Sequence, residues 1–301
     1  MRFLATVLIL LTAGLVHAEE AAVSDSTTTK TKMPSEVTAQ RKDIDEEITN
    51  KKLRAETGAK SVISLKSAFA YSGGSINSPL SQERPQLSPG TTNPEPSKLS
   101  GSISAKYRIS DHDSMSLGVG VGWLTPTYQG QKGQVENPYL GYTRAFKTGI
   151  IQNVIEASIV KYTSNSASKN DDLWNSNFDY TILAKVGHSR LDLGLDLGYY
   201  REFYSQTTAR NGDNPLDYVA LYPFAEYELN DMASLRTVYR GFSYFNSSND
   251  QKTFVHDDPT QSFGVGLAIT RDIYLYPNLQ WVWADVRAEK TNVAISANIN
   301  L

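Results

Sequence analysis

From about residue 61 to the end of the chain, apolar and polar side chains alternate with a period of two. The pattern is clearest over residues 191–199, where Leu or Tyr alternates with Asp or Gly. Because successive side chains of a β-strand point to opposite faces, this pattern predicts strands with one apolar face. The alternation persists for nine to eleven residues, which is longer than an ordinary soluble strand. That length matches a tilted strand that crosses a membrane.

The connections between these segments alternate in length. Each short connection, such as Asn230–Asp231, is followed by a long one, such as 246–260. Short turns at one end and long loops at the other are typical of an outer-membrane barrel with both termini in the periplasm. We therefore predict an all-β fold over residues 61–301, a twelve-stranded antiparallel transmembrane β-barrel preceded by a short N-terminal helix. The expected strands lie near residues 61–73, 98–110, 114–124, 137–147, 150–163, 174–186, 190–201, 217–229, 232–245, 261–270, 273–284 and 291–301.

A soluble β-sandwich also alternates, because it buries one face of each sheet in a core. Two features favour a membrane barrel over a sandwich. The polar face consists mainly of Ser, Gly and Asn with isolated charges, as expected for a packed or water-filled lumen. Tyr and Trp recur at strand ends, where outer-membrane barrels carry aromatic girdles. The expected girdle residues are Tyr107, Trp123, Tyr162, Trp174, Tyr199, Tyr227, Trp281 and Trp283.

The first eighteen residues have the pattern of a secretory signal peptide. A positive start at Arg2 precedes an apolar run over residues 3–16, and a small-residue cleavage site ends at Ala18. The run is shorter than the roughly 20 residues of a spanning helix, so an uncleaved anchor is the less favoured alternative. Residues 19–33 are Ser, Thr, Ala and charged residues with little to bury, and we expect them to be disordered.

A helix is predicted from Glu36 to Glu56, within a periplasmic segment that reaches residue 60. Its apolar stripe is thin and consists mainly of Val37, Ile44 and Ile48. A solvated helix is the favoured interpretation, while a self-associating coiled coil and a helix docked on or in the barrel are alternatives. Because packing supplies most helix stability, we expect the barrel to fold when residues 19–58 are deleted.

Composition narrows the possible chemistry. The chain has no Cys, which excludes disulfides, thiolate zinc sites and cysteine catalysis. A formal net charge of −3 gives no reason to expect a nucleic-acid partner. No cofactor or metal site is predicted, although His256 beside two aspartates can hold a divalent cation; a solvated loop is the favoured interpretation. Gly118, Gly120 and Gly122 leave space for another segment inside the barrel or mark a bend of its wall.

The signal peptide, the alternating hairpins, the girdles and a last strand ending Asn298-Ile299-Asn300-Leu301 resemble the bacterial outer-membrane β-barrel proteins, which are porin-like. The resemblance covers residues 61–301. It implies a bacterial outer-membrane location, contact with outer-membrane lipid, and recognition of the last strand by the barrel-assembly machinery. The usual final residue in that class is Phe, so Leu301 is a weaker form of the signal.

The class does not define a function, because pores, hydrolases, adhesins and anchors share it. In the outer-membrane phospholipase A family, the catalytic His lies on a strand, facing lipid. In this sequence His112 and His188 fall in predicted short turns and His256 in a long loop. We therefore expect no enzyme, and predict a passive pore for small solutes or a structural surface protein. An outer-membrane hydrolase is the alternative.

Charged residues within the strands are expected to point inward, because a basic side chain facing lipid at mid-membrane costs about 2–4 kcal/mol. Basic residues on the first, second and ninth strands would then face acidic residues on the fifth to eighth across a narrow bore. Salt bridges between neighbouring strands that close the lumen are the alternative, and Arg144 is ambiguous. The expected lumen-lining residues are Lys66, Lys106, Arg108, Glu156, Asp179, Asp192, Asp196, Glu226, Glu228, Arg236 and Arg240.

Overall fold

The computed structural model describes residues 48–57, 61–85, 87, 95–124, 133–164, 172–205, 215–247 and 251–301. The chain divides into two compact units, Met1–Gln40 and Arg41–Leu301, and all described residues belong to the second. The predicted signal peptide, the tail at 19–33 and the part of the predicted helix before Ile48 lie outside the described residues. Within the described ranges, no helix is long and apolar enough to cross a membrane.

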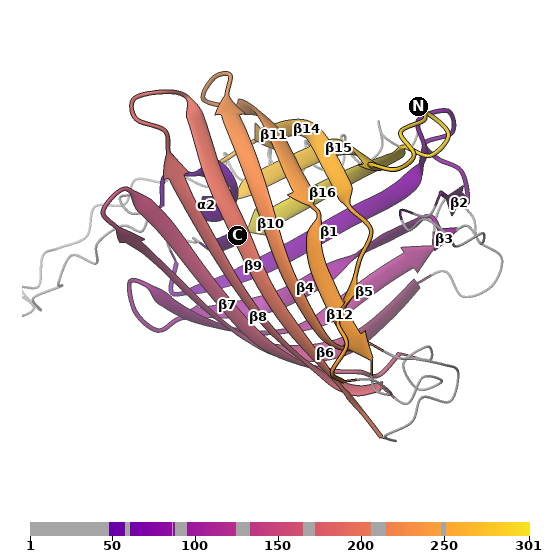
Figure 1. Ribbon diagram of the computed structural model, residues 1–301. Coiled ribbons are helices and arrows are strands. Elements are labelled where there is room, and N and C mark those ends of the chain that lie inside the picture. Colours follow the sequence, from indigo (N-terminus) through magenta and orange to yellow (C-terminus); the bar gives the residue numbers. More distant parts are fainter. Residues whose placement is uncertain are drawn as a thin grey trace, which may run out of the picture. The chain divides into compact units, whose positions relative to one another are not determined.

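Antiparallel strands form a closed barrel (Figure 1). Each wall strand pairs with its neighbours in the chain, and the last strand returns to pair with the first over Lys66–Ser75. The strands are β1 (Ile63–Ser75), β2 (Glu83–Arg84), β3 (Glu95–Pro96), β4 (Lys98–Arg108), β5 (Asp113–Leu124), β6 (Gly133–Thr148), β7 (Ile151–Lys161), β8 (Asp172–Lys185), β9 (Leu191–Tyr204), β10 (Pro215–Glu228), β11 (Ala233–Arg240), β12 (Phe242–Ser247), β13 (Val255–His256), β14 (Thr260–Ala268), β15 (Ile273–Val282) and β16 (Asn292–Asn300).

The wall contains twelve strands, as the sequence predicts. β11 and β12 are two parts of one wall strand, since both pair with β10 on either side of Gly241. On their other edge β14 pairs with β11 and the short β13 pairs with β12, so these two also form one interrupted strand. β2 and β3 form a separate hairpin within the long connection between β1 and β4.

The short turns lie together at one end of the barrel, which we call the short-turn end; the other is the long-loop end. Two of these turns contain glycines with positive φ, 61° at Gly149 and 55° at Gly187. L-residues rarely adopt that backbone conformation, so glycine permits these tight reversals.

The wall bends where β5 meets β6. The pairing register shifts between Gly118 and Gly120, opposite Asn137, whose φ is 53°. A Cβ atom added to Gly118 would lie 2.6 Å from the carbonyl oxygen of Ile103. This β-bulge corresponds to the second of the two roles predicted for the glycines, a bend of the wall.

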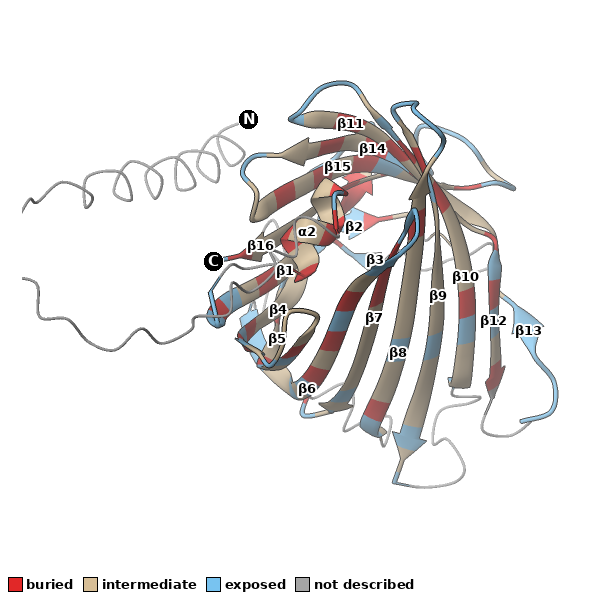
Figure 2. Ribbon diagram, turned by 90° about the vertical axis from the view of Figure 1, so that its left-hand side faces the viewer, coloured by how far each residue is buried: buried red, intermediate tan, exposed pale blue. Residues whose placement is uncertain are grey.

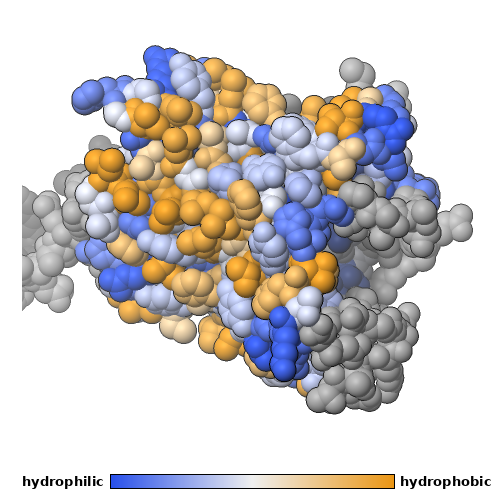
Figure 3. All heavy atoms as spheres, in the orientation of Figure 1, coloured by the Kyte–Doolittle hydropathy of each residue, from blue (hydrophilic) through white to orange (hydrophobic). Residues whose placement is uncertain are grey.

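The two faces of the wall have opposite character. Large apolar side chains are exposed on the outer face, among them Leu117 at 67%, Ile159 at 55% and Leu193 at 50%. Figure 3 shows such residues distributed over the outer surface of the strands. The interior contains buried polar groups such as Ser104 and Glu226, each 2% exposed. An apolar exterior around a polar interior is the arrangement of a transmembrane barrel.

Candidate functional site

The barrel interior is the candidate functional site, and a segment of the chain that precedes the wall occupies its short-turn half. Residues 48–57, here called the plug segment, contain the helix α2 (Lys51–Thr57). Figure 2 shows α2 within the ring of strands. The helix contacts β6, β14, β15 and β16, which lie on different sides of the barrel.

Apolar side chains anchor the plug segment. Ile48 is fully buried and Leu53 is 2% exposed. On the opposite side of the helix, Ala55 packs against Tyr274 and Tyr276 of β15. The wall therefore presents apolar side chains where it faces this segment. Ile48 and Leu53 form a cluster with Ala145, Val154, Leu183, Phe224 and Val238, contributed by β6, β7, β8, β10 and β11.

Polar groups of the wall bind the start of the helix. The Asn50 side-chain oxygen accepts a hydrogen bond from the backbone N–H of Leu53 at 3.2 Å, which makes Asn50 the N-cap of α2. Gln152 Oε1 accepts the backbone N–H groups of Thr49 at 2.7 Å and Asn50 at 3.0 Å. The side-chain amide of Asn50 also donates to Asp192 at 3.4 Å and Glu226 at 3.3 Å. One residue thus joins the helix to two strands.

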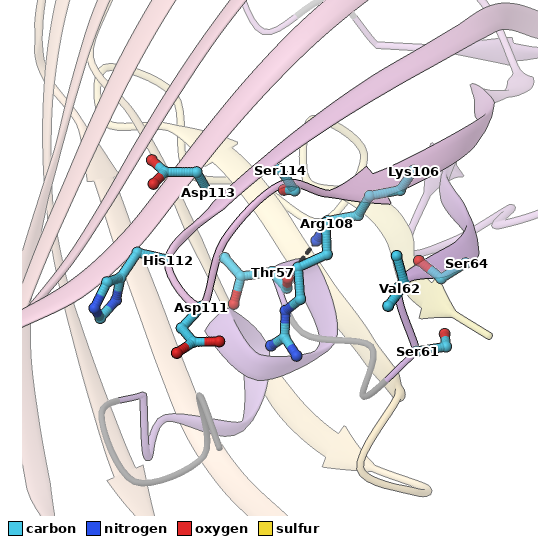
Figure 4. A pocket seen from close by; sticks show the side chains of 10 residues that line it. All are labelled: Thr57, Ser61, Val62, Ser64, Lys106, Arg108, Asp111, His112, Asp113 and Ser114. Atoms are coloured by element: carbon cyan, nitrogen blue, oxygen red, sulfur yellow. Dashed lines mark hydrogen bonds between the residues drawn. The ribbon is translucent and has the colours of Figure 1, made fainter. Parts of the chain in front are cut away.

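The end of the helix is held in the same way. The Lys106 ammonium donates to the carbonyl oxygen of Thr57, a group that helix geometry leaves without an internal partner (Figure 4). Asn298 of β16 donates to Glu56 at 3.1 Å, and Lys51 donates to the carbonyl oxygen of Asn230 in a short turn at 2.8 Å. The plug segment thus has partners around the circumference of the barrel, and we conclude that it fills the cross-section near the short-turn end.

This arrangement corrects the favoured interpretation of the N-terminal segment. A solvated helix is wrong for residues 48–57, and the alternative of a helix docked in the barrel describes them. The described helix is also shorter than predicted, because it begins at Lys51.

The carboxylates around the plug segment are paired with basic side chains. Arg236 and Glu226 face each other on neighbouring strands at 3.0 Å, with side-chain exposures of 4% and 2%. The Arg236 guanidinium also lies 4.2 Å from the centre of the Phe224 ring. Lys185 contacts Asp192 at 3.3 Å and Glu228 at 3.0 Å. These contacts correspond to the predicted alternative in which salt bridges between nearby strands close the lumen.

One ion pair crosses the interior. Lys66 of β1 and Glu156 of β7 lie 3.0 Å apart, although β4, β5 and β6 separate their strands along the wall. Thr143 donates a further hydrogen bond to Glu156 at 3.3 Å. The predicted basic and acidic arcs therefore do meet at this level.

Two inner carboxylates nearer the long-loop end, those of Asp179 and Asp196, form no ion pair among the described residues. Asp179 accepts a hydrogen bond from the Tyr200 hydroxyl at 2.6 Å, and Asp196 accepts one from Thr181 at 2.7 Å. Beyond them is a cavity of about 410 Å³ between β7 and β10. The interior thus changes along its length from a filled part, whose carboxylates are in ion pairs, to a hollow part, in which Asp179 and Asp196 are in none.

The two remaining predicted lumen residues lie on the same inner face. Arg108 borders a small cavity beside Thr57 at the short-turn end (Figure 4). Arg240 donates to Ser262 at 3.4 Å, and its guanidinium lies 5.9 Å from the Tyr222 ring. Arg144, which was ambiguous, shares the outer face with Leu140 and pairs with Asp113 at 3.2 Å.

Most predicted girdle residues lie on the outer face. Tyr162 is the exception, because its hydroxyl donates to Glu202 at 3.0 Å and it borders the interior cavity. Its assignment to the girdle is wrong, since its position places it on the same side of β7 as Glu156. Trp281 is half-buried on the outer side of β15. The others are 39–55% exposed: Tyr107, Trp123, Trp174, Tyr199, Tyr227 and Trp283.

Two interior residues are not among the predicted lumen-lining residues, although the alternation of side chains places them on the inner face. Lys185 lies an even number of positions from Asp179 on β8, and Glu202 has the same relation to Asp196 on β9. Asn50 and Gln152 gave no such signal, because a single Asn or Gln is common in any polar stretch. Their roles depend on contacts between segments about a hundred residues apart.

Of the three described histidines, His112 and His188 lie in short turns and His256 lies in β13. His112 is followed two residues later by a Ser, Ser114 of β5. Ser114 is 7% exposed and borders the small interior cavity beside Thr57, so it does not face lipid. The His256 ring donates to the carbonyl oxygen of Gly241 at 2.8 Å. Among the described residues, no three His, Asp or Glu side chains lie close enough to hold a metal ion.

A closed barrel of twelve antiparallel strands with an apolar exterior and a polar interior belongs to the architectural class of bacterial outer-membrane β-barrels. No protein-family model and no curated protein sequence matches the chain. An outer-membrane channel from Pseudomonas putida F1 has a similar structure, with a TM-score of 0.51 and 9% sequence identity over 80% of this chain and 96% of that one. The KdgM porin in complex with disordered oligogalacturonate shares 10% identity, with a TM-score of 0.44 over 79% of this chain and 99% of that one. At 9% identity the likeness to the Pseudomonas putida channel shows the fold alone.

Proposed function

We propose that this protein is a channel for small solutes in the bacterial outer membrane, and that the plug segment controls its conductance. The observation that carries this proposal is the position of residues 48–57 inside a wall that closes without them. Every wall strand pairs on both edges with other wall strands. The plug segment can therefore leave the bore without breaking the barrel, and its departure would open the short-turn end.

The polar interior supports the same proposal. A barrel that served only as an anchor would have no need for a cavity of about 410 Å³ or for inner carboxylates that form no ion pair.

We further propose that the short-turn end faces the periplasm, that outer-membrane lipid surrounds the apolar face, and that the assembly machinery recognises β16. Cysteines introduced at Ser189 and Ser81 test the orientation. An impermeant thiol reagent should label Ser81→Cys on intact cells and should not label Ser189→Cys; the opposite result would invert the orientation.

Single-channel recordings in planar bilayers test the role of the plug segment. Leu53→Asp places a carboxylate in the apolar cluster, which is unfavourable enough to expel the segment into water. We expect this variant to conduct in steps several-fold larger than those of the unmodified protein. Leu80→Asp is the matched control, because Leu80 is 40% exposed in a loop at the long-loop end, and its step size should not change.

A reversible cross-link provides a second test that retains the native segment. Glu56 and Asn298 are joined by a hydrogen bond of 3.1 Å, and the chain has no other cysteines to interfere. Cysteines at both positions, joined by a short bifunctional reagent, should hold the channel in its low-conductance state. If folded Leu53→Asp and the cross-linked protein both conduct like the unmodified protein, the plug segment does not control passage. If none of the variants conducts, the protein is not a channel.

A further inference from the structure

The interior cavity near the long-loop end has a lining unlike the rest of the bore. Tyr162, Tyr200 and Tyr218 border it together with Asn175, Asn177 and Glu202. The rings of Tyr200 and Tyr218 are 5.8 Å apart and tilted by 59°, so they present both a face and an edge. At about 410 Å³ the cavity is within the range of small-molecule sites.

The carboxylate of Glu202 is held in place from one side only. Its Oε1 atom accepts hydrogen bonds from Tyr162 at 3.0 Å and from Asn175 at 2.6 Å. Its Oε2 atom is buried and accepts none. A buried carboxylate oxygen without a donor is unfavourable, so a ligand that supplies an N–H group would stabilise it.

The lining of the cavity carries no basic side chain of its own, because no Lys or Arg is among the described residues that line it. The other lining carboxylate, Asp217, is already matched by Arg201 at 2.9 Å, which leaves Glu202 as the unbalanced charge. Asp179, bonded to the Tyr200 hydroxyl, extends the negative region toward the middle of the bore.

We propose that this cavity binds a small organic cation that carries a guanidinium group. The charged group would pair with Glu202, and the tyrosine rings would pack against its apolar part and its positive charge. This inference deepens the proposed function, because it names the class of solute that the channel admits. A neutral sugar would use the tyrosines and asparagines but would leave the charge of Glu202 unbalanced.

Isothermal titration calorimetry on the full chain in detergent tests this proposal with two probes of nearly equal size. L-Arginine carries a guanidinium, and L-citrulline has an uncharged ureido group in its place. We expect saturable binding of arginine and at least about tenfold weaker binding of citrulline, which corresponds to about 1.4 kcal/mol. Equal affinities, or no binding of either probe, would overturn the proposal on the unmodified protein alone.

Two matched variants locate the site. Glu202→Gln keeps the size of the side chain and removes its charge, and should weaken arginine binding about tenfold. Glu228→Gln is the control, because this interior carboxylate pairs with Lys185 at the short-turn end. Unchanged affinity in Glu202→Gln would exclude the cavity as the site. Binding is measured without conduction, so arginine binding by a protein that never conducts would refute only the channel, and conduction without binding would refute only the cation site.

Discussion

The two halves of the barrel interior solve the problem of buried charge in opposite ways. At the short-turn end, Glu226 and Asp192 are each 2% exposed and each contacts a cation and the side chain of Asn50. Toward the long-loop end, Asp179, Asp196 and Glu202 accept hydrogen bonds from hydroxyl or amide groups and form no ion pair among the described residues. The difference follows the plug segment, which occupies only the first half.

The contrast shows what the plug segment changes physically. Where protein fills the bore, little water remains to solvate a carboxylate, so a buried carboxylate there needs a partner of opposite sign. Where a cavity remains, water or a solute can solvate it. A bore that is dry at one end and hollow at the other is suited to hold a solute in the hollow half until the filled half opens.

Removing one partner of the most buried ion pair should have the largest effect on stability. Arg236→Ala leaves Glu226 charged and enclosed, and also removes the contact with the Phe224 ring. We expect the free energy of unfolding to fall by about 3–5 kcal/mol, measured by urea titration of tryptophan fluorescence. Arg144→Ala removes an ion pair on the outer face whose arginine is 48% exposed, and should cost less than about 1 kcal/mol. Similar losses in both variants would show that the filled half is not dry.

Truncating the apolar anchor of the plug segment should have the next largest effect. Leu53→Ala opens a cavity in the apolar cluster to which five strands contribute side chains. We expect the free energy of unfolding to fall by about 3 kcal/mol. The same substitution should raise the channel conductance, because it destabilises the state in which the plug segment lies inside the bore. Leu80→Ala, in an exposed loop, should change neither. A stability loss without any change in conductance would make the segment a purely structural filling.

Substitutions of two aspartates on the inner face of β9 should have different effects, because one aspartate is in an ion pair beside the plug segment and the other is not. Asp192→Asn weakens contacts to Lys185 and Asn50, and should lower the free energy of unfolding by about 1.5–3 kcal/mol. Asp196→Asn breaks no ion pair and should leave stability nearly unchanged. Instead it should reduce the cation preference measured from reversal potentials in a salt gradient. If neither variant changes either quantity, the assumed inward register of β9 is wrong.

The wall was predictable from the sequence because membrane and lumen impose a period of two on every strand. The alternation alone placed Lys66, Glu156 and Asp192 on the inner face, where the structure has them. Tyr162 was misassigned because an aromatic residue at a strand end suits either a girdle or a lumen. Only its position in the alternation, six residues beyond the inward-facing Glu156, distinguishes the two roles.

The plug segment was not predictable in the same way. Its stripe of apolar residues is too thin to specify a partner, and the partner surface consists of single inward residues such as Val154 and Leu183 on separate strands. In the sequence, each of those looks like one irregularity in an otherwise polar face. The expectation that the barrel folds without residues 19–58 remains a prediction, although deletion would expose that apolar surface to water.

The smallest expected effect concerns Asn50, which both caps the helix α2 and binds carboxylates of the wall. Asn50 caps the helix through its oxygen and donates to Asp192 and Glu226 through its amide nitrogen. Asn50→Ala removes both functions and should lower the free energy of unfolding by about 1 kcal/mol. Asn50→Ser restores a capping oxygen but is too short to donate to both carboxylates, so the difference between the variants measures the cap alone. We expect Asn50→Ser to recover part of the lost stability in urea titration. Equal stability of the two variants would show that the helix is held by its contacts with the wall and owes nothing to its own N-cap.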